Sequence, residues 1–456
     1  GNACARPSAP GPRHRLDAMQ DRRGCPVSTA SDAALDHLEQ ALWRLSSFYG
    51  DPLADLDAAS AADPGWMLPH VMRAGFLLTL TERHLLAPAR EALETAARCC
   101  GNAREQAHLA AAQRAWAGDW QGACELWERL LLDHPCDHLA LQLAHLFDFY
   151  RGDARELRLR VARVLPAWPR DDALYRYVLG MYAFGLEENH LYPQAEAVGR
   201  EALDDGARVP WAVHAVAHVM EMQGRHDEGR AWLHAQRRNW SEDDNGLRGH
   251  NAWHLALFYL EAMDLTGALQ VYDSEVAPLI EGGLTLQRLD AAAMLWRLQL
   301  LGADVGPRWQ ALAARWARDT EAVGHYAFND AHALMACLGA GDVAGAEALL
   351  ARVIDQAQTQ PGLHRAMAQE VGLPLMSGLI AFARQDWDAA VAHLAPLRAV
   401  AHRFGGSHAQ RDLIDLTLMA ACSRGSHRSL GRALLNERLL AKGSTPQVAY
   451  WRSRLG

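Results

Sequence analysis

The chain has 456 residues, of which 50% are hydrophobic and 22% charged, and its formal net charge is -9. This length exceeds that of one compact helical bundle, so we expect several domains or one extended repeat array. Acidic and basic residues are interspersed throughout the sequence. No basic stripe is present that could neutralise a run of phosphates, so nucleic acid is not an expected partner.

Cysteine and lysine usage bear on the setting of the protein. The eight cysteines form no C-x-x-C pair and no regular framework, which favours a reduced, cytoplasmic environment. We find no apolar run of roughly 18 residues and no signal-peptide pattern in residues 1–25, so no membrane partner is expected. Lys442 is the only lysine among 45 basic residues, which is typical of a GC-rich bacterial coding sequence.

The first 27 residues differ from the rest of the chain. Residues 1–27 carry several Pro, Gly and Arg without apolar periodicity, and they predict a disordered N-terminal arm. From Ser28 onward helix formers dominate with a spacing of 3.6 residues, as in Leu35, Leu38 and Leu42. No alternating strand pattern persists, so residues 28–456 are predicted to be all-α.

A short turn pattern recurs along the chain. In residues 104–137, Ala123, Trp127 and Pro135 have the spacing of a 34-residue tetratricopeptide unit, and Gly118-Asp119 predicts the tight turn between its two helices. Four further copies of this turn begin at Gly224, Met263, Gly341 and Gln385. Because other units differ in loop length, we expect residues 28–456 to form a single degenerate tetratricopeptide-type α-solenoid with a right-handed superhelix.

Histidines occur in pairs within this pattern. His214, His218 and Glu221 stand at i, i+4 and i+7, which places them on one helical face. His250 and His254 repeat the i, i+4 spacing 36 residues later. We therefore expect the two pairs to lie on equivalent helices of adjacent repeats.

Steps of about one repeat from these pairs reach further polar residues. The row comprises His70, His108, His145, Tyr182, His218, His254 and Asp290, at intervals of 36 to 38 residues. Asn329, Asp330 and His332 open a later helix and extend it. Such a register predicts a line of titratable side chains along the concave surface of the solenoid.

The paired histidines support alternative interpretations. Imidazole and carboxylate ligands suit a divalent metal such as zinc, with His214, His218, Glu221, His250 and His254 as the expected ligands. The pattern differs from the H-E-x-x-H motif because Ala215 occupies the position of the catalytic Glu. Alternatively, each histidine satisfies buried polarity between helices, and the flanking Trp211 and Trp253 pack in the core.

Nine short segments share their sequence and order with one known family. They are Pro26–Ser31, Arg104–His108, Ala123–Glu128, Phe184–Glu188, Val213–His218, His250–His254, Phe328–His332, Val371–Leu375 and Gly405–Asp412. These segments resemble the tetratricopeptide repeat protein 38 family over nearly the whole folded chain. The resemblance implies a helical-repeat fold and supplies no settled activity, cofactor or catalytic residue. His408 stands where the family pattern has Asn, so the resemblance does not support an essential role for it.

Two functions follow as hypotheses. The first is a binding protein that captures a small molecule or peptide in a concave groove. Its predicted lining is His108, His145, Tyr182, Glu188, Trp211, Asn251, Trp253, Asp290, His332 and Arg411. The second is a hydrolase, lyase or cyclase that uses His214, His218, His250, His254 and Asp330 as acid/base groups or metal ligands. The sequence leaves open a homodimer and the identity of any cofactor.

Overall fold

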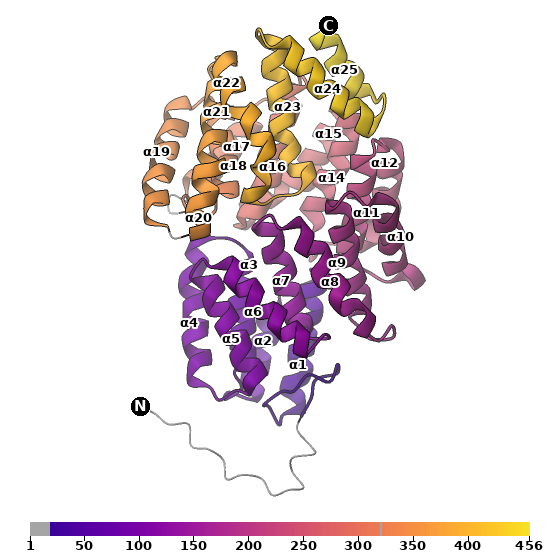
Figure 1. Cartoon of the computed structure of the whole chain (residues 1–456), viewed down its shortest axis with the longest axis vertical. Coiled ribbons are helices and arrows are strands. Elements are labelled where there is room, and N and C mark those ends of the chain that lie inside the picture. Colours follow the sequence, from indigo (N-terminus) through magenta and orange to yellow (C-terminus); the bar gives the residue numbers. More distant parts are fainter. Residues whose placement is uncertain (1–18, 320–321, 361) are drawn as a thin grey trace, which may run out of the picture. The chain divides into compact units, whose positions relative to one another are not determined.

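The computed structural model describes residues 19–319, 322–360 and 362–456. These residues are mainly helical, and they include isolated bridges such as Gln20 with Pro26 and Trp66 with Cys100. The predicted all-α class is therefore confirmed (Figure 1). The chain divides into two compact units. Unit 1 contains the described residues up to Asp148 together with Leu159–Val178, and unit 2 contains Phe149–Arg158 and Leu179–Gly456.

Unit 1 is built from helical hairpins in which α1 packs on α2, α3 on α4 and α5 on α6. Helix α5 begins with a capping box between Asn102 and Glu105, which satisfies free amides of its first turn. Its helices are α1 (Asp32–Ser47), α2 (Pro52–Ala62), α3 (Leu68–Thr79), η1 (Arg83–Leu85), α4 (Leu86–Arg98), α5 (Ala103–Trp116), α6 (Trp120–Asp133), η2 (Leu165–Ala167) and parts of α7 (His138–Tyr150), α8 (Ala154–Val164) and α9 (Tyr175–Glu188).

The folded part of unit 1 begins before Ser28. Residues 1–18 of the predicted arm lie outside the described residues, but residues 19–27 form a turn in which the amide of Val27 donates to the carbonyl of Met19 at 3.0 Å. The Arg23 side chain is 1% exposed and pairs with Glu39 at 2.5 Å and Asp172 at 3.3 Å. This buried ion pairing anchors a segment whose Pro, Gly and Arg content suggested disorder.

Unit 2 continues the helical hairpins. It contains the remaining parts of α7, α8 and α9, and α10 (Tyr192–Ala202), η3 (Asp204–Gly206), α11 (Pro210–Met222), α12 (His226–Ala235), α13 (Arg237–Trp240), α14 (Arg248–Glu261), α15 (Leu265–Val271), η4 (Tyr272–Val276), η5 (Ala277–Gly282), α16 (Thr285–Leu300), α17 (Arg308–Ala317), α18 (Ala327–Gly339), α19 (Val343–Thr359), α20 (Gly362–Met367), η6 (Ala368–Gly372), α21 (Leu373–Ala383), α22 (Trp387–Leu394), η7 (Ala395–Ala399), η8 (Ala401–Phe404), α23 (His408–Arg424), α24 (Arg428–Lys442) and α25 (Pro446–Leu455).

The recurrent turns have the form that the sequence predicts. At each turn the first residue of the pattern has a left-handed backbone, with φ between 56° and 85° at Gly118, Gly224, Met263, Gly341 and Gln385. In four of the five turns the next residue is an Asp whose carboxylate caps the second helix, as Asp264 does for Gly267 at 2.9 Å. The turn that begins at Gly224 has Arg225 instead and no side-chain cap. The turn geometry thus explains why Gly and Asp recur.

The C-terminal helices return onto the first helices of these hairpins within unit 2. Helices α11, α14, α16 and α18 pack in succession, and α23 packs on α16 (Figure 1). Trp296 on α16 donates to Thr417 on α23 at 3.0 Å, and Arg297 donates to the carbonyl of Ala409 at 2.8 Å. These contacts join residues more than 100 positions apart. They hold α23 against α16, the helix that carries Asp290.

One helical segment is apolar enough to cross a membrane by length and composition. It spans Gly362–Ala383 and has a mean hydropathy of 1.3 over its most apolar 18 residues, which corrects our expectation that no such run exists. In the structure 61% of that window is buried. Val371, Leu375 and Leu379 are each at most 3% exposed, so packing inside unit 2 accounts for the apolar character of this segment.

Candidate functional site

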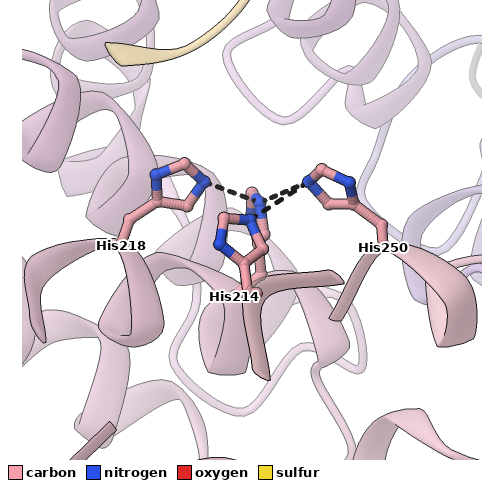
Figure 2. A group of neighbouring side chains, drawn as sticks. His214, His218 and His250 are labelled. Carbon is pink, nitrogen blue, oxygen red and sulfur yellow. Dashed lines mark hydrogen bonds between the residues drawn. The ribbon is translucent and has the colours of Figure 1, made fainter. Parts of the chain in front are cut away.

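Four histidines from α11 and α14 converge inside unit 2. Each helix presents two histidines one turn apart, so both imidazoles of a pair lie on the same face. Ala215 on α11 and Ala252 and Ala256 on α14 are fully buried, and such small side chains let neighbouring helices approach closely. Figure 2 shows His214, His218 and His250 directing the tips of their rings toward one another.

The Nε2 atoms form the centre of this cluster. Nε2 of His214 lies 2.8 Å from Nε2 of His218 and 3.1 Å from Nε2 of His250. Nε2 of His250 lies 3.2 Å from Nε2 of His254. One ring nitrogen of each of the four histidines lies within 4.8 Å of the others. The two pairs, which the sequence predicts to lie on neighbouring helices, are therefore in direct contact.

Three of the four rings in the cluster are buried. His214, His218 and His254 are at most 2% exposed, whereas the side chain of His250 is 21% exposed. Burial, together with the neighbouring imidazoles, holds the pKa of His214 and of His254 well below 6.5 and lowers the pKa of His218 to about 3. These three rings are therefore neutral at pH 7, and each has one N–H group and one nitrogen lone pair.

A carboxylate stands behind two of the four rings. Nδ1 of His250 lies 3.1 Å from Oδ1 and 3.2 Å from Oδ2 of Asp290 on α16. Nδ1 of His218 lies 3.7 Å from Oε1 of Glu187 at the end of α9. Because an ionised carboxylate accepts only, Asp290 fixes the proton of His250 on Nδ1 and leaves the Nε2 lone pair directed into the cluster.

Glu187 is one of a pair of buried carboxyl groups. Burial, and then the charge of Glu188, raises the pKa of Glu187 well above its usual value. Burial acts to raise the pKa of Glu188 as well, but its contact with Glu187 and the nearby His408 bring it below the usual value. The pair therefore holds one proton when no cation is present. Ligand atoms of Glu187, Glu188 and His218 lie within 4.8 Å of one another.

Aromatic rings enclose the histidines. Trp211 stacks on His214 with ring centroids 4.6 Å apart, and Trp253 stacks on His250 at 5.5 Å. Phe184 packs against His214 and His218 at 5.4 and 5.5 Å. Both tryptophans flank the histidines as the sequence suggested. They act as an apolar wall, which excludes water and strengthens electrostatic interactions at the cluster.

Hydrogen bonding alone leaves this arrangement unsatisfied. Since His250 directs a lone pair inward, His214 would have to donate its single inward N–H to both His218 and His250. The Nδ1 atoms of His214 and His254 would then be acceptors, and both are buried without a hydrogen-bond donor among the described residues. A cation in the centre would instead use all four Nε2 lone pairs.

The distances fit the ligand shell of one metal ion. With metal–nitrogen bonds of about 2.0–2.1 Å, neighbouring ligands are separated by roughly 2.9 Å at right angles and roughly 3.3 Å in a tetrahedron. The three Nε2 separations of 2.8, 3.1 and 3.2 Å fall close to this range. All four histidines could hold the same ion without rearrangement of the helices.

Other residues that we expected at the site lie elsewhere in unit 2. Glu221, an expected metal ligand, forms an ion pair with Lys442 at 2.7 Å and is not part of the cluster. Asp330 accepts from the amide of Gly324 at 2.9 Å, and Nδ1 of His332 donates to the carbonyl of Phe328 at 2.8 Å. Tyr182 packs against the apolar cluster that contains Leu186. These contacts account for the four side chains structurally.

Two expected groove residues belong to unit 1. His108 bonds Asp137 at 2.8 Å, and Arg104 pairs with the same carboxylate, so this histidine is part of a buried ion network. His145 is buried, and burial lowers its pKa to about 3. His108 thus satisfies buried polarity within unit 1, which is the alternative that the sequence left open for single histidines.

Three further residues that we expected to line the site are Glu188, Arg411 and Asn251. Glu188 and Arg411 line a cavity of about 1090 Å³ in unit 2. Arg411 donates to the carbonyl of Gly406 and to Nδ1 of His408 at 3.1 Å. Asn251 on α14 is fully buried, and neither its amide oxygen nor its nitrogen has a partner among the described residues.

Glu187 is the residue at the site that the sequence did not single out. Its only signal is the adjacent acidic pair at the end of a helix, which usually marks a solvated helix end. The chain as a whole is an all-α protein with a buried cluster of four imidazoles and two supporting carboxylates. No protein-family model matches this sequence.

Proposed function

We propose that this chain is a metalloprotein that binds a divalent transition-metal ion through Nε2 of His214, His218, His250 and His254. The observation that carries the proposal is the convergence of four ring nitrogens, three of them on buried neutral rings, which all lie within 4.8 Å of one another and form three contacts of 2.8 to 3.2 Å. Leu or Ala would serve packing equally well at these positions, whereas inward lone pairs serve a cation.

Charge balance supports the same conclusion. A divalent ion with four neutral ligands would place two positive charges in a buried site, which is unfavourable unless anions stand nearby. Asp290, which contacts His250, and the Glu187–Glu188 pair next to His218 supply this negative charge. A carboxylate behind a metal-bound imidazole also fixes the tautomer and raises the basicity of the ligand.

Zinc is the first candidate among such ions. Neutral imidazole suits zinc, copper, nickel and iron, so the donor set alone excludes none of these. Zinc has no geometric preference from its d-electrons, and four protein ligands bind it in a tetrahedral arrangement, whose ligand separation of roughly 3.3 Å is close to the 3.1 and 3.2 Å seen for two of the three contacts. Copper(II) and nickel(II) prefer four nitrogen ligands in a plane, which gives a spectroscopic means of distinguishing them from zinc.

Metal analysis tests the proposal directly. The full chain, produced without a polyhistidine tag and reconstituted with zinc, is expected to lose one equivalent of metal when His214→Ala and His254→Ala are combined. His332→Ala is the matched control, since His332 is also buried and helical but lies outside the cluster. X-ray absorption should report nitrogen ligands at about 2.0–2.1 Å. Equal metal content in the parent and the double variant would overturn the proposal.

A catalytic use of this ion is the second candidate function. His250 is the least buried ligand, with 21% of its side chain exposed, while the other three rings are enclosed. Departure of this one imidazole would give water or a substrate access to the ion, and catalytic zinc sites keep such a position open. Hydrolysis of an ester or amide by the parent, lost with chelator and restored by zinc, would support this role.

We also propose that the helical hairpins are of the tetratricopeptide type. The left-handed turn residue followed by a capping Asp in four of five hairpins supports this assignment. The resemblance of the nine sequence segments to the tetratricopeptide repeat protein 38 family is consistent with it. Burial of the histidines makes an ion a better occupant of the site than a peptide in a groove.

A further inference from the structure

A second set of potential ligands adjoins the histidine cluster. Glu187 and Glu188 end α9, and both are at most 3% exposed. Three of their four carboxyl oxygens, both oxygens of Glu187 and Oε2 of Glu188, accept no hydrogen bond from a donor group among the described residues, and the two carboxyl groups contact each other through a hydrogen bond that needs a shared proton. Leaving such groups unpaired in a protein interior is costly, so a cation or proton must occupy this place.

The imidazole of His218 faces both sets of ligands. Its Nε2 atom lies 2.8 Å from His214 in the four-histidine cluster. Its Nδ1 atom, on the opposite side of the ring, is buried and unpartnered, and lies 3.7 Å from Oε1 of Glu187. That separation is too long for a hydrogen bond. It is compatible with two ligands of one ion, each at about 2.0–2.2 Å from the metal.

The fourth carboxyl oxygen shows how this pair is held. Oε1 of Glu188 accepts from the amide of His408 at the start of α23, at 3.2 Å. Nε2 of His408 donates to the carbonyl of Glu188 at 2.9 Å, because its Nδ1 atom accepts from Arg411. The left-handed Gly405-Gly406 turn, with φ of 84° and 79°, precedes α23 and places its first residue beside Glu188. These contacts orient the carboxylate without neutralising its charge.

We propose that Glu187, Glu188 and Nδ1 of His218 form a second divalent-cation site, so that the protein holds two ions bridged by the His218 imidazole. This inference deepens the proposed function and rests on it for the bridging role of His218. Binding of the second ion releases the proton shared by the two carboxyl groups and the Nδ1 proton of His218 to solvent. The mixed oxygen and nitrogen donors suit zinc, manganese or iron.

Of the two proposed metal sites, only the second has a ligand that lines a cavity. Glu188 lines the cavity of about 1090 Å³, whose wall also includes Glu221, His408 and Arg411. None of the four clustered histidines lines this cavity. The second ion would therefore be the one that meets a molecule bound in the cavity, while the first supports it through His218.

Stoichiometry of the full chain tests this inference. We expect two zinc ions per chain for the parent and one for Glu187→Gln/Glu188→Gln, with Glu188→Gln alone as a second variant if the double variant folds poorly. Glu221→Gln is the control, because Glu221 lines the same cavity and is paired with Lys442 instead. It should retain both ions.

Copper provides a test of the bridge. With copper(II) in both sites, coupling through a shared imidazole should weaken the electron paramagnetic resonance signal per copper by at least about tenfold, and Glu187→Gln/Glu188→Gln should restore a full single-copper signal. One ion in the parent, unchanged by Glu187→Gln/Glu188→Gln, would overturn the second site while leaving the four-histidine site intact. Two ions with full, uncoupled signals would overturn the bridge, and no ion in the parent would overturn both proposals.

Discussion

The carboxylate of Asp290 lies 3.1 Å from Nδ1 of His250, a residue forty positions earlier in the sequence. Asp290 is 5% exposed and sits on α16, the helix that packs next to α14. This contact selects the tautomer in which Nε2 of His250 presents a lone pair to the other three histidines. The orientation of His250, the least buried of the four rings, thus depends on a helix that contributes no ligand.

Replacing Asp290 by Asn is expected to weaken zinc binding by about 10- to 100-fold, because a supporting carboxylate raises the basicity of the imidazole and holds its orientation. Competition with a chromophoric chelator measures this affinity. Asp273→Asn is the control, since Asp273 pairs with Arg308 in an exposed ion pair away from the histidines. An Asp290→Asn variant with the zinc affinity of the parent would show that the contact does not support a metal ligand.

Substitutions at the first residue of two recurrent turns should change the stability of the protein in opposite directions. Gln385 has φ of 62° and is exposed, so Gln385→Gly should stabilise unit 2 by up to about 1 kcal/mol by relieving left-handed strain. Gly341 has φ of 80° in the same turn position, and a Cβ there would meet nothing within 4 Å. Gly341→Ala should therefore destabilise by about 1 kcal/mol through backbone strain alone. Urea unfolding measures the change in the free energy of unfolding for both variants, and changes of the same sign would contradict this account.

The turns and the histidine pairs could be predicted because both depend on local spacing. An i, i+4 pair lies on one helical face whatever surrounds it, and the offset of 36 residues places His214 beside His250 with ring centroids 4.9 Å apart. The longer row was predicted less well. His108 follows the same spacing but bonds Asp137, since spacing fixes a register and does not specify which partner a side chain finds.

Contacts between distant segments could not be predicted in this way. Repeat periodicity encodes neighbouring units, whereas His408 reaches Glu188 across 220 positions and Thr445 reaches Glu261 across 184. Such pairs leave no periodic signal in one sequence. The return of α23 places the amide of His408 on the carboxylate of Glu188, at a helix end that the sequence alone marks as solvated.

Two histidines of unit 1 predict a loss of stability in acid. Burial lowers the pKa of His138 and of His145 to about 3, whereas an unfolded histidine titrates near 6.5. Below pH 6.5 the unfolded chain gains protons that the folded unit excludes, so stability falls progressively from about pH 6.5 toward pH 3. At pH 5 each residue should contribute about 2 kcal/mol of this loss.

Urea unfolding at pH 7 and pH 5 measures this effect. The combined His138→Gln and His145→Gln variant should show a smaller decrease in stability between the two pH values than the parent. His393→Gln is the control, because His393 is exposed on α22 and its replacement should leave the decrease unchanged. An equal decrease in the parent and the double variant would show that these histidines already exchange protons in the folded unit.

The single lysine of the chain predicts the largest effect on stability. The Lys442 side chain is 6% exposed, and its Nζ atom lies 2.7 Å from Glu221 and 3.5 Å from Glu261, which are 8% and 2% exposed. Lys442→Met would leave both carboxylates buried without their cation, and removing one partner from a buried ion group costs about 3–5 kcal/mol. Arg90→Met, at an exposed i, i+4 pair with Glu94, should cost less than about 1 kcal/mol.

A compensating variant separates lost charge from lost packing. If unpaired carboxylates cause the instability of Lys442→Met, adding Glu221→Gln and Glu261→Gln should recover most of it, since Gln retains the shape of Glu without its charge. Thr445 donates to Glu261 at 2.6 Å and could donate equally to the amide oxygen of Gln. Urea unfolding of the single and triple variants should differ by at least about 2 kcal/mol. A triple variant as unstable as Lys442→Met would assign the effect to packing of the lysine stem between α24 and its neighbours.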